Sequence, residues 1–386
     1  MAISSSPPSL TQTVVRALCL HLFQCQARWR RLYSLPLVLR EAIRTMRIPP
    51  HLIKGIEDSL TEILLEVERW TDKHAEMFEG AEKPKMKERA PRQEHLRTYY
   101  YCLRWRSDRL EIRDQSTALE IIRKECKNWP QLKFQFACLY AREKLIRDDF
   151  IFDKYYRIAF KKRLSYHPVY DFWLTLLDVG EEKLFHVENN RAQNQRVMLC
   201  FKFAITNGYL ELTKWMWNKI SPAGREYIVL LQWRAMAFRV RSRETFKYLC
   251  EQMCKVNRPA VARFTWTVFY DAVYKTLEED QQKEHTKTMA KLRIILASSC
   301  RQTRLRLLKW DNYKAITDAF YYNNATVFSL LLQHLPDSQI RLVRERIDRI
   351  LDRRLDVNPR LQKLVIRRQQ TLEEPPTAEE LEYLTH

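Results

Sequence analysis

The stretch FKFAITNGYLELTKWMW, residues 201–217, decides how the rest of the chain is interpreted. It contains one helix-like apolar run that ends near Asn207 and Gly208, and a second run that continues to the tryptophans. Asparagine and glycine tolerate the left-handed backbone conformation that a tight turn requires. The stretch therefore predicts two short helices joined by a turn, with the small Ala204 where the two helices approach closely. Leu212 and residues 215–217 are expected to form the face that the next pair covers, and Trp215→Ala to cost about 3–5 kcal/mol.

A weaker copy of this stretch follows at an interval of 33 residues. Ala204 corresponds to Ala237, and Trp215 corresponds to Tyr248. A fixed period of this size is typical of stacked helical pairs that cannot bury their apolar faces alone. The other residues that repeat at the same interval are Glu211 with Glu244 and Lys214 with Lys247.

Two further copies lie on either side of these. Residues 134–137 repeat the pattern of residues 201–204, about two periods earlier. Near the end of the chain, Ala319 opens another copy, with Leu330 in the place of Trp215. Its distance from Ala204 is not a multiple of the period, so we expect residues 257–310 to break the register.

These copies resemble the ankyrin repeat, and most closely the divergent ankyrin-region proteins of the kind found in nematodes. The resemblance covers residues 95–355 and is clearest at 199–250 and 314–333. The consensus turn glycine is present at Gly208, whereas the other copies have Ala141, Arg241 and Asn323 in its place. The resemblance implies helical pairs without the usual β-hairpins. Its signature residues here are Ala204, Gly208, Leu212, Trp215, Ala237, Tyr248, Ala319 and Leu330.

Composition favours the same fold class. The 386 residues include only five glycines, whereas dinucleotide-binding folds, phosphate-binding loops and hairpin-rich β proteins need glycine at their turns. We therefore predict an all-α protein, built as an irregular α-solenoid of stacked helical pairs with a small N-terminal helical region. The predicted segments are a disordered N-terminus (1–12), N-terminal hairpin or docking helices (13–79), a basic linker (80–95), the repeats (96–356) and a flexible charged tail (357–386).

The N-terminal region contains the most regular helical pattern. Apolar residues from Ile53 to Met77 alternate at spacings of three and four, with Leu64 and Leu65 widening the stripe and polar His74 interrupting it. One interpretation is a coiled-coil or docking helix that leaves the stripe for a partner. The other is a helical hairpin in which residues 14–47 cover the stripe.

The net charge of +20 favours an acidic partner. We expect an intracellular protein-interaction scaffold, cytoplasmic or nuclear, that binds an acidic protein through the face of the repeats. The alternative is a basic helical-repeat protein that binds RNA through interleaved cations and aromatics, at residues 99–106 and 155–163. The candidate anion-binding or partner-binding residues are Arg28, Arg30, Arg31, Lys161, Lys162 and Arg163.

No motif predicts an enzyme, a cofactor or a metal site. The nine cysteines are irregularly spaced, mostly within apolar helical patterns, so they are interpreted as core residues of a reducing compartment. Asp148, Asp149 and Asp153 resemble a magnesium-binding cluster, but their spacing is one residue too long and no second motif follows. His186 and Glu188 lack the cysteines of a zinc deaminase. Neither a signal peptide nor an apolar run long enough to span a membrane is predicted.

Overall fold

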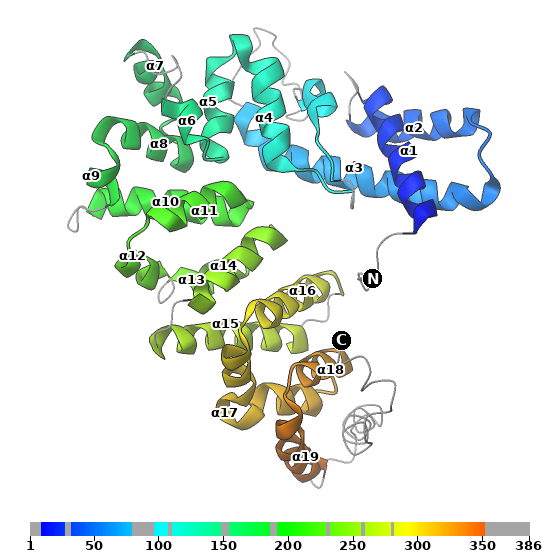
Figure 1. Cartoon of the computed structure of the whole chain (residues 1–386), viewed down its shortest axis with the longest axis vertical. Coiled ribbons are helices and arrows are strands. Elements are labelled where there is room, and N and C mark those ends of the chain that lie inside the picture. Colours follow the sequence, from blue (N-terminus) through cyan, green and yellow to red (C-terminus); the bar gives the residue numbers. More distant parts are fainter. Residues whose placement is uncertain are drawn as a thin grey trace, which may run out of the picture. The chain divides into compact units, whose positions relative to one another are not determined.

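The computed structural model describes residues 9–27, 32–78, 96–106, 110–147, 154–185, 191–228, 232–255, 259–278 and 282–351. These residues form α-helices joined by short turns and 3-10 helices (Figure 1). Their one β-type contact is an isolated bridge between Trp105 and Ile112. The predicted all-α fold class is therefore confirmed, whereas the arrangement as a solenoid stays a prediction. The predicted linker (80–95) and tail (357–386) lie outside the described residues.

The first three helices are α1 (Leu10–Gln26), α2 (Leu35–Thr45) and α3 (Pro50–Phe78), and α1 and α2 both pack against α3. Helix α1 begins within the segment predicted to be disordered. The reason is a capping box, in which the Ser9 side chain accepts from the Gln12 backbone and the Gln12 side chain accepts from the Ser9 backbone. Two donors that would otherwise lack partners are satisfied there, so the helix begins at Leu10.

Helix α3 uses its apolar stripe within the chain, as the hairpin interpretation describes. Ile53 at the start of the stripe is exposed, and α3 also packs against α5 and the 3-10 helix η3 (Leu96–Cys102). The buried residues of the stripe are Ile56, Leu60, Ile63, Val67, Trp70 and Met77. Two expectations about this stripe are wrong. His74 continues the stripe instead of interrupting it, since it is fully buried, and Leu65 is exposed instead of widening the apolar face.

The chain divides into two compact units. Unit 1 comprises Met1–Ala204 and Glu211–Met216, and unit 2 comprises Ile205–Leu210 and Trp217–His386. The boundary therefore runs through two helices, α10 (Arg191–Asn207) and α11 (Leu210–Lys219). The other helices of unit 1 are α4 (Asp114–Glu125), α5 (Pro130–Leu139), α6 (Glu143–Arg147), α7 (Lys154–Leu164), α8 (Pro168–Val179) and α9 (Glu181–Phe185).

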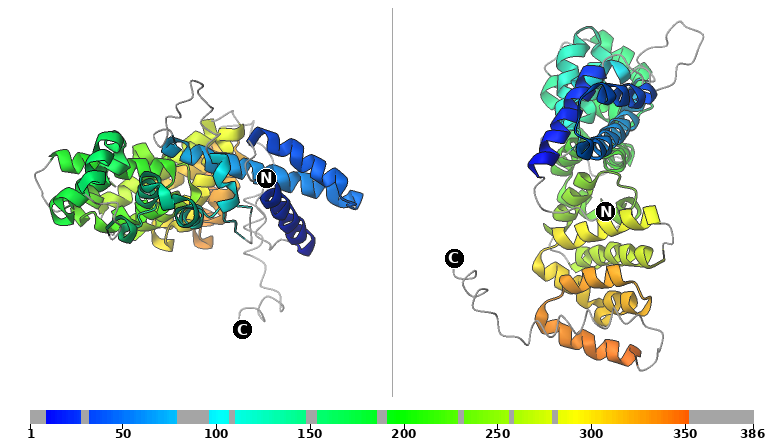
Figure 2. Two further views of the ribbon diagram at one scale, coloured as in Figure 1. Left: turned by 90° about the horizontal axis from the view of Figure 1, so that it is seen from above. Right: turned by 90° about the vertical axis from the view of Figure 1, so that its right-hand side faces the viewer.

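Unit 2 continues with helices that pack in sequence. Helix α15 packs against α16 and α17, and α17 packs against α18 and α19 (Figure 2). The helices of this unit after α11 are α12 (Pro222–Tyr227), α13 (Trp233–Ala237), α14 (Arg243–Lys255), α15 (Pro259–Glu278), α16 (Gln282–Ser298), α17 (Arg301–Tyr321), α18 (Ala325–Gln333) and α19 (Asp337–Leu351). Helices α15 and α16 occupy most of the segment expected to break the register.

The helical pairs share one turn geometry at three places. Ala141, Gly208 and Asn323 all have positive φ, at 48°, 72° and 56°. Each backbone N–H of these residues donates to the carbonyl three residues earlier, and at two of the turns the next N–H donates to the carbonyl five residues earlier. This pair of bonds is the Schellman motif, which ends a helix and reverses the chain. The carbonyls that accept the longer bond belong to Ala137 and Ala319.

The fourth expected turn differs. Among the described residues, Arg241 is not one of those with positive φ. Its N–H donates to the carbonyl of Thr206 instead, at 3.4 Å, while Val240 before it is buried. In the left-handed backbone conformation, Cβ of an arginine would lie too close to the following carbonyl oxygen. The chain avoids this cost because it reverses direction over several residues. The placement of Arg241 in the glycine position was therefore wrong.

A second irregular segment lies inside α17. Asp311, Asn312 and Tyr313 all have positive φ, so the helix is interrupted there and resumes toward Tyr321. The Tyr313 ring is buried, and its hydroxyl donates to Oε1 of Gln339 in α19. This interruption places Ala319 and Asn323 in a separate helical segment, which pairs with α18 as the sequence copy predicts.

Candidate basic interface

The cations singled out from the sequence have different surroundings. Lys161 forms an ion pair with Asp178, which Arg157 also contacts at 3.5 Å. These pairs join α7 to α8. Lys162 and Arg163 are exposed on α7. The other three predicted anion-binding residues, Arg28, Arg30 and Arg31, lie outside the described residues.

Several aromatic residues proposed for base stacking are occupied within unit 1. Tyr100 is buried, with its hydroxyl 3.3 Å from that of Thr71. Trp105 packs edge-on against Phe23, with ring centroids 5.8 Å apart. A nucleic-acid base would have to displace these contacts. The segment around residues 99–106 therefore anchors η3 to the helices beside it and offers no free stacking surface at these two rings.

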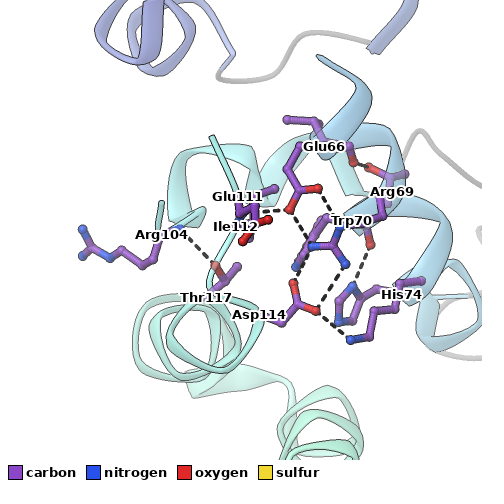
Figure 3. A network of polar contacts seen from close by, with 12 residues as sticks. Glu66, Arg69, Trp70, His74, Arg104, Glu111, Ile112, Asp114 and Thr117 are labelled. Atoms are coloured by element: carbon purple, nitrogen blue, oxygen red, sulfur yellow. Dashed lines mark hydrogen bonds and ion pairs between the residues drawn. The ribbon is translucent and has the colours of Figure 1, made fainter. Parts of the chain in front are cut away.

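The densest polar network joins α3 to the start of α4 (Figure 3). The Asp114 carboxylate accepts from Arg69 at 2.8 Å and from Lys73 at 2.6 Å. Glu66 accepts from the N–H of Ile112 at 2.8 Å and also holds Arg69. Burial alone would raise the pKa of Asp114, but Lys73 and Arg69 outweigh it and hold that pKa well below its usual range. Asp114 is held by two cations and Glu66 by Arg69 and a backbone N–H, so the network fixes the start of α4 against α3.

His74, beside this network, is a core histidine. Its Nδ1 lies 2.7 Å from the carbonyl oxygen of Trp70, which can only accept, so Nδ1 carries the proton. Its Nε2 then accepts from the Tyr140 hydroxyl at 2.6 Å. Burial lowers the pKa of His74 to about 3, so the ring is neutral at neutral pH.

His167 is also buried, in the loop that precedes α8. Its Nδ1 accepts from the N–H of Val169 at 3.3 Å and so caps α8. The ring stacks on Tyr170, with centroids 4.2 Å apart. Burial lowers the pKa of His167 to about 4. His334, grouped with it in the sequence, is half-buried beside Arg304.

A basic surface that the sequence patterns did not single out lies in unit 2. Arg239, Arg241 and Arg243 are exposed and alternate with buried Val240 and half-buried Ser242. Arg239 lies in the turn that follows α13, and Arg243 is the first residue of α14, so the three exposed arginines lie on the connection between two helices. None of the three makes an ion pair or side-chain hydrogen bond with another residue in the described part of the chain.

Two lysines from other helices complete this surface. Lys275 of α15 lies over the ring of Phe238, with Nζ 4.6 Å from the ring centroid. Lys291 of α16 donates to the carbonyl oxygens of Phe238 and Ala237, at 2.6 and 3.2 Å, and so caps the end of α13. We call these five cations the basic patch: Arg239, Arg241, Arg243, Lys275 and Lys291.

The helices around the basic patch are fixed in place. Arg234 of α13 binds Asp271 of α15 through two hydrogen bonds, at 2.6 and 2.8 Å. This bidentate geometry is the strongest that an arginine and a carboxylate form. Trp233 of α13 stacks on Phe246 of α14, with centroids 5.7 Å apart. The segment that carries the three arginines is therefore held at both ends by packed helices.

Sequence patterns missed the basic patch for two reasons. The turn between Ala237 and Tyr248 was interpreted as a degenerate repeat turn, so its alternating arginines were not read as a surface. Lys275 and Lys291 lie far from it in the chain, and only folding brings them to Phe238. The alternation itself, RVRSR at residues 239–243, is the one signal in the sequence that points to this surface.

The residues predicted to mark the repeats lie in the core or at the turns. Ala204, Leu212, Ala237, Ala319 and Leu330 are buried. Gly208 forms the turn described above, and Tyr248 is half-buried. Trp215 was expected to form the face that the following pair covers. Its ring packs against α8, with its centroid 4.7 Å from that of Trp173, and its Nε1 donates to Glu143 of α6 at 2.9 Å.

The remaining candidate motifs add no site. Within the described residues, no group of three or more His, Cys, Asp or Glu side chains is arranged to hold a metal ion. Residues 148–153 and 186–188 lie outside them. No described helix is both long and apolar enough to cross a membrane. Comparisons with protein-family models, curated proteins and solved structures found no match for the chain.

Proposed function

We propose that this chain is a non-enzymatic interaction protein that binds an acidic segment of another protein at the basic patch. The observation that carries the proposal is the set of three exposed arginines, 239, 241 and 243, without an anionic partner in the described part of the chain. Surface arginines often have a carboxylate neighbour, as Arg234 has in Asp271. The helical-repeat architecture resembling ankyrin-region proteins supports the proposal, because such arrays present surfaces for binding.

The three arginines lie within five residues of the chain, so one short acidic segment can contact all of them. Arginine binds carboxylates through paired hydrogen bonds, which gives such a contact direction as well as charge. The expected partner segment therefore contains several Asp, Glu or phosphorylated residues close together.

The aromatic residue at the basic patch favours protein over nucleic acid. Single-stranded nucleic acid is usually bound by stacking its bases on aromatic rings that lie along a basic groove. Phe238 is the ring beside the three arginines, and Lys275 already lies over it at 4.6 Å. A base would have to displace that lysine. The RNA-binding alternative is therefore treated as an outcome of the test below.

The test measures binding of defined probes to the full chain. Fluorescence anisotropy would follow a labelled peptide of about ten residues with glutamate at alternate positions, and a single-stranded RNA of similar charge. We expect the peptide to bind and the Arg239→Glu/Arg241→Glu/Arg243→Glu variant to bind at least about tenfold more weakly, because three charge-assisted contacts are reversed.

A matched variant controls for net charge. Arg306, Arg341 and Arg349 are exposed cations elsewhere in unit 2, and their reversal to glutamate lowers the net charge from +20 to +14, as in the first variant. Affinity within about twofold of the parent is expected for this control. Equal losses in both variants would show non-specific attraction and overturn the proposal. Tighter binding of the RNA, lost in the first variant alone, would assign the basic patch to nucleic acid instead.

A further inference from the structure

The N-terminal helices carry several apolar side chains that are largely exposed. In α1, Leu10 and Val14 are 82% and 59% exposed. In and before α2, Tyr33 and Leu37 are 70% and 69% exposed. Sixteen large apolar residues are exposed in the described part of the chain, and seven of them lie between residues 10 and 65. Single exposed apolar residues are ordinary, but a concentration of this kind marks an interaction surface.

Helix α1 has a buried apolar face and an exposed face on which apolar and polar side chains are mixed. The inner face, with Val15, Cys19, Leu22 and Phe23, is buried, and Cys19 reaches the carbonyl of Ile56 in α3. The outer face carries exposed residues at helical spacing, namely Leu10, Val14, Ala17 and His21. A helix that only covers a core has a polar outer face, so the outer face of α1 is not explained by its packing on α3.

Helix α2 combines exposed apolar and basic side chains on one face. Tyr33, Leu37, Arg40 and Arg44 follow one another at spacings of four, three and four, and all are exposed. The opposite face, with Leu35, Leu39 and Ile43, is buried. Leucine, tyrosine and arginine on a single helix face are the composition that interfacial helices present to lipid headgroups.

Positive charge is concentrated at the start of this region, whereas residues 57–78 of α3 contain seven acidic and two basic side chains. Residues 1–56 contain eight arginines and lysines, and Glu41 is their one acidic residue. This excess attracts anionic surfaces, where each basic side chain adds to the affinity. It also disfavours a second copy of the chain as the occupant, because two equally basic surfaces would repel each other when they meet.

We propose that the outer faces of α1 and α2 bind the interface of an anionic lipid bilayer. Leu10, Val14 and Leu37 enter the boundary between headgroups and acyl chains, and Arg40 and Arg44 contact the lipid phosphates and carboxylates. The surface lies in unit 1, whereas the basic patch lies in unit 2. The inference is therefore independent of the proposed function.

Vesicle sedimentation of the full chain tests this. We expect binding to phosphatidylcholine vesicles with about 30% phosphatidylserine, and at least about tenfold weaker binding to phosphatidylcholine alone. The Leu10→Ser/Leu37→Ser variant should partition at least about tenfold less, because two apolar contacts are lost. The Arg40→Glu/Arg44→Glu variant should lose the preference for phosphatidylserine. The matched control Leu199→Ser/Leu342→Ser, at exposed leucines elsewhere, should bind as the parent does.

The outcomes that overturn the inference are distinct. Equal sedimentation with both lipid compositions, or none with either, would contradict it. The inference would also be contradicted if the triple Arg239, Arg241 and Arg243 variant lost vesicle binding while the leucine and Arg40/Arg44 variants bound normally. Light scattering that shows a dimer dissolved by Leu10→Ser/Leu37→Ser would identify a second copy as the occupant. Circular dichroism must show equal helix content in all variants, and since every altered residue is exposed, we expect it to do so.

Discussion

The residue at a left-handed turn decides how much strain the turn stores. Ala141 and Gly208 occupy the same position of the same motif, with φ of 48° and 72°. Alanine pays a steric cost there that glycine avoids. At Gly208 the space is limited as well, because an added Cβ would lie 2.4 Å from Cβ of Ser242. We therefore expect Ala141→Gly and Gly208→Ala to change the stability of the protein in opposite directions.

We expect Ala141→Gly to raise the free energy of unfolding by about 0.5–1 kcal/mol, since relief of strain exceeds the added flexibility of the unfolded chain. Gly208→Ala should lower it by more than about 2 kcal/mol, because strain and a clash act together. Urea unfolding followed by circular dichroism measures both changes. Stabilisation by Gly208→Ala, or loss of stability in Ala141→Gly, would contradict the turn geometry.

We expect the buried His74 to make the free energy of unfolding depend on pH. Its pKa is lowered to about 3 by burial, so the unfolded chain takes up a proton near its ordinary pKa while the folded chain does not. Stability that depends on neutral His74 is therefore present at neutral pH and is lost as the pH falls below the unfolded value. Between about pH 7 and pH 5 we expect a loss of about 2 kcal/mol from this group.

The His74→Gln variant tests this linkage. It should be less stable than the parent at about pH 7, because the bonds to Trp70 and Tyr140 are weakened, but its stability should fall less on acidification. The control is His51→Gln at an exposed position of α3, for which we expect the parent's pH dependence. Parallel pH curves for His74→Gln and the parent would disprove the assignment. Chemical unfolding at several pH values provides the measurement.

At the scale of elements, Trp215 shows what the repeat pattern missed. The sequence predicted that this side chain faces the next helical pair, with a cost of about 3–5 kcal/mol on truncation. It lies instead against Trp173, Phe172 and Phe185 and is half-buried. Periodicity assigns a residue to a helix face, but the direction from which a neighbour approaches depends on tertiary packing.

We therefore expect Trp215→Ala to cost about 2–3 kcal/mol, less than truncation of a fully buried tryptophan. Trp215→Phe should retain most of the ring contacts and lose only the hydrogen bond to Glu143, at a cost of about 1 kcal/mol. Thermal unfolding of both variants would measure the difference. Equal destabilisation by the two changes would mean that the hydrogen bond, and not the packing, carries the effect.

The helical pairs show which features a local sequence pattern can predict. The turns at Ala141 and Asn323 have the bonds of a Schellman motif, which needs only a few neighbouring residues, and Gly208 shares their positive φ. The same pattern failed at Arg241, where the chain finds a partner in Thr206 instead of in its own helix. It also failed at His74, since hydropathy alone does not reveal that Trp70 and Tyr140 satisfy both ring nitrogens.

At the scale of the whole molecule, the charge of +20 has a distribution that composition does not reveal. Some cations are neutralised within the fold, as Arg69 and Lys73 are by Asp114. Others remain exposed, at the basic patch in unit 2 and on α2 in unit 1. The two exposed groups differ in character, because apolar residues accompany the arginines of α2, and so they suit different anionic partners.

The sequence by itself determined that the chain is helical and that its net charge is +20, and from that charge we infer an anionic partner. Those properties follow from glycine content, periodicity and net charge, which are local or additive. Only the tertiary structure decided which cations are free. Ion pairs join residues that are far apart in the chain, such as Arg234 and Asp271. The exposure of Arg239, Arg241 and Arg243 depends on the packed helices at both ends of their segment.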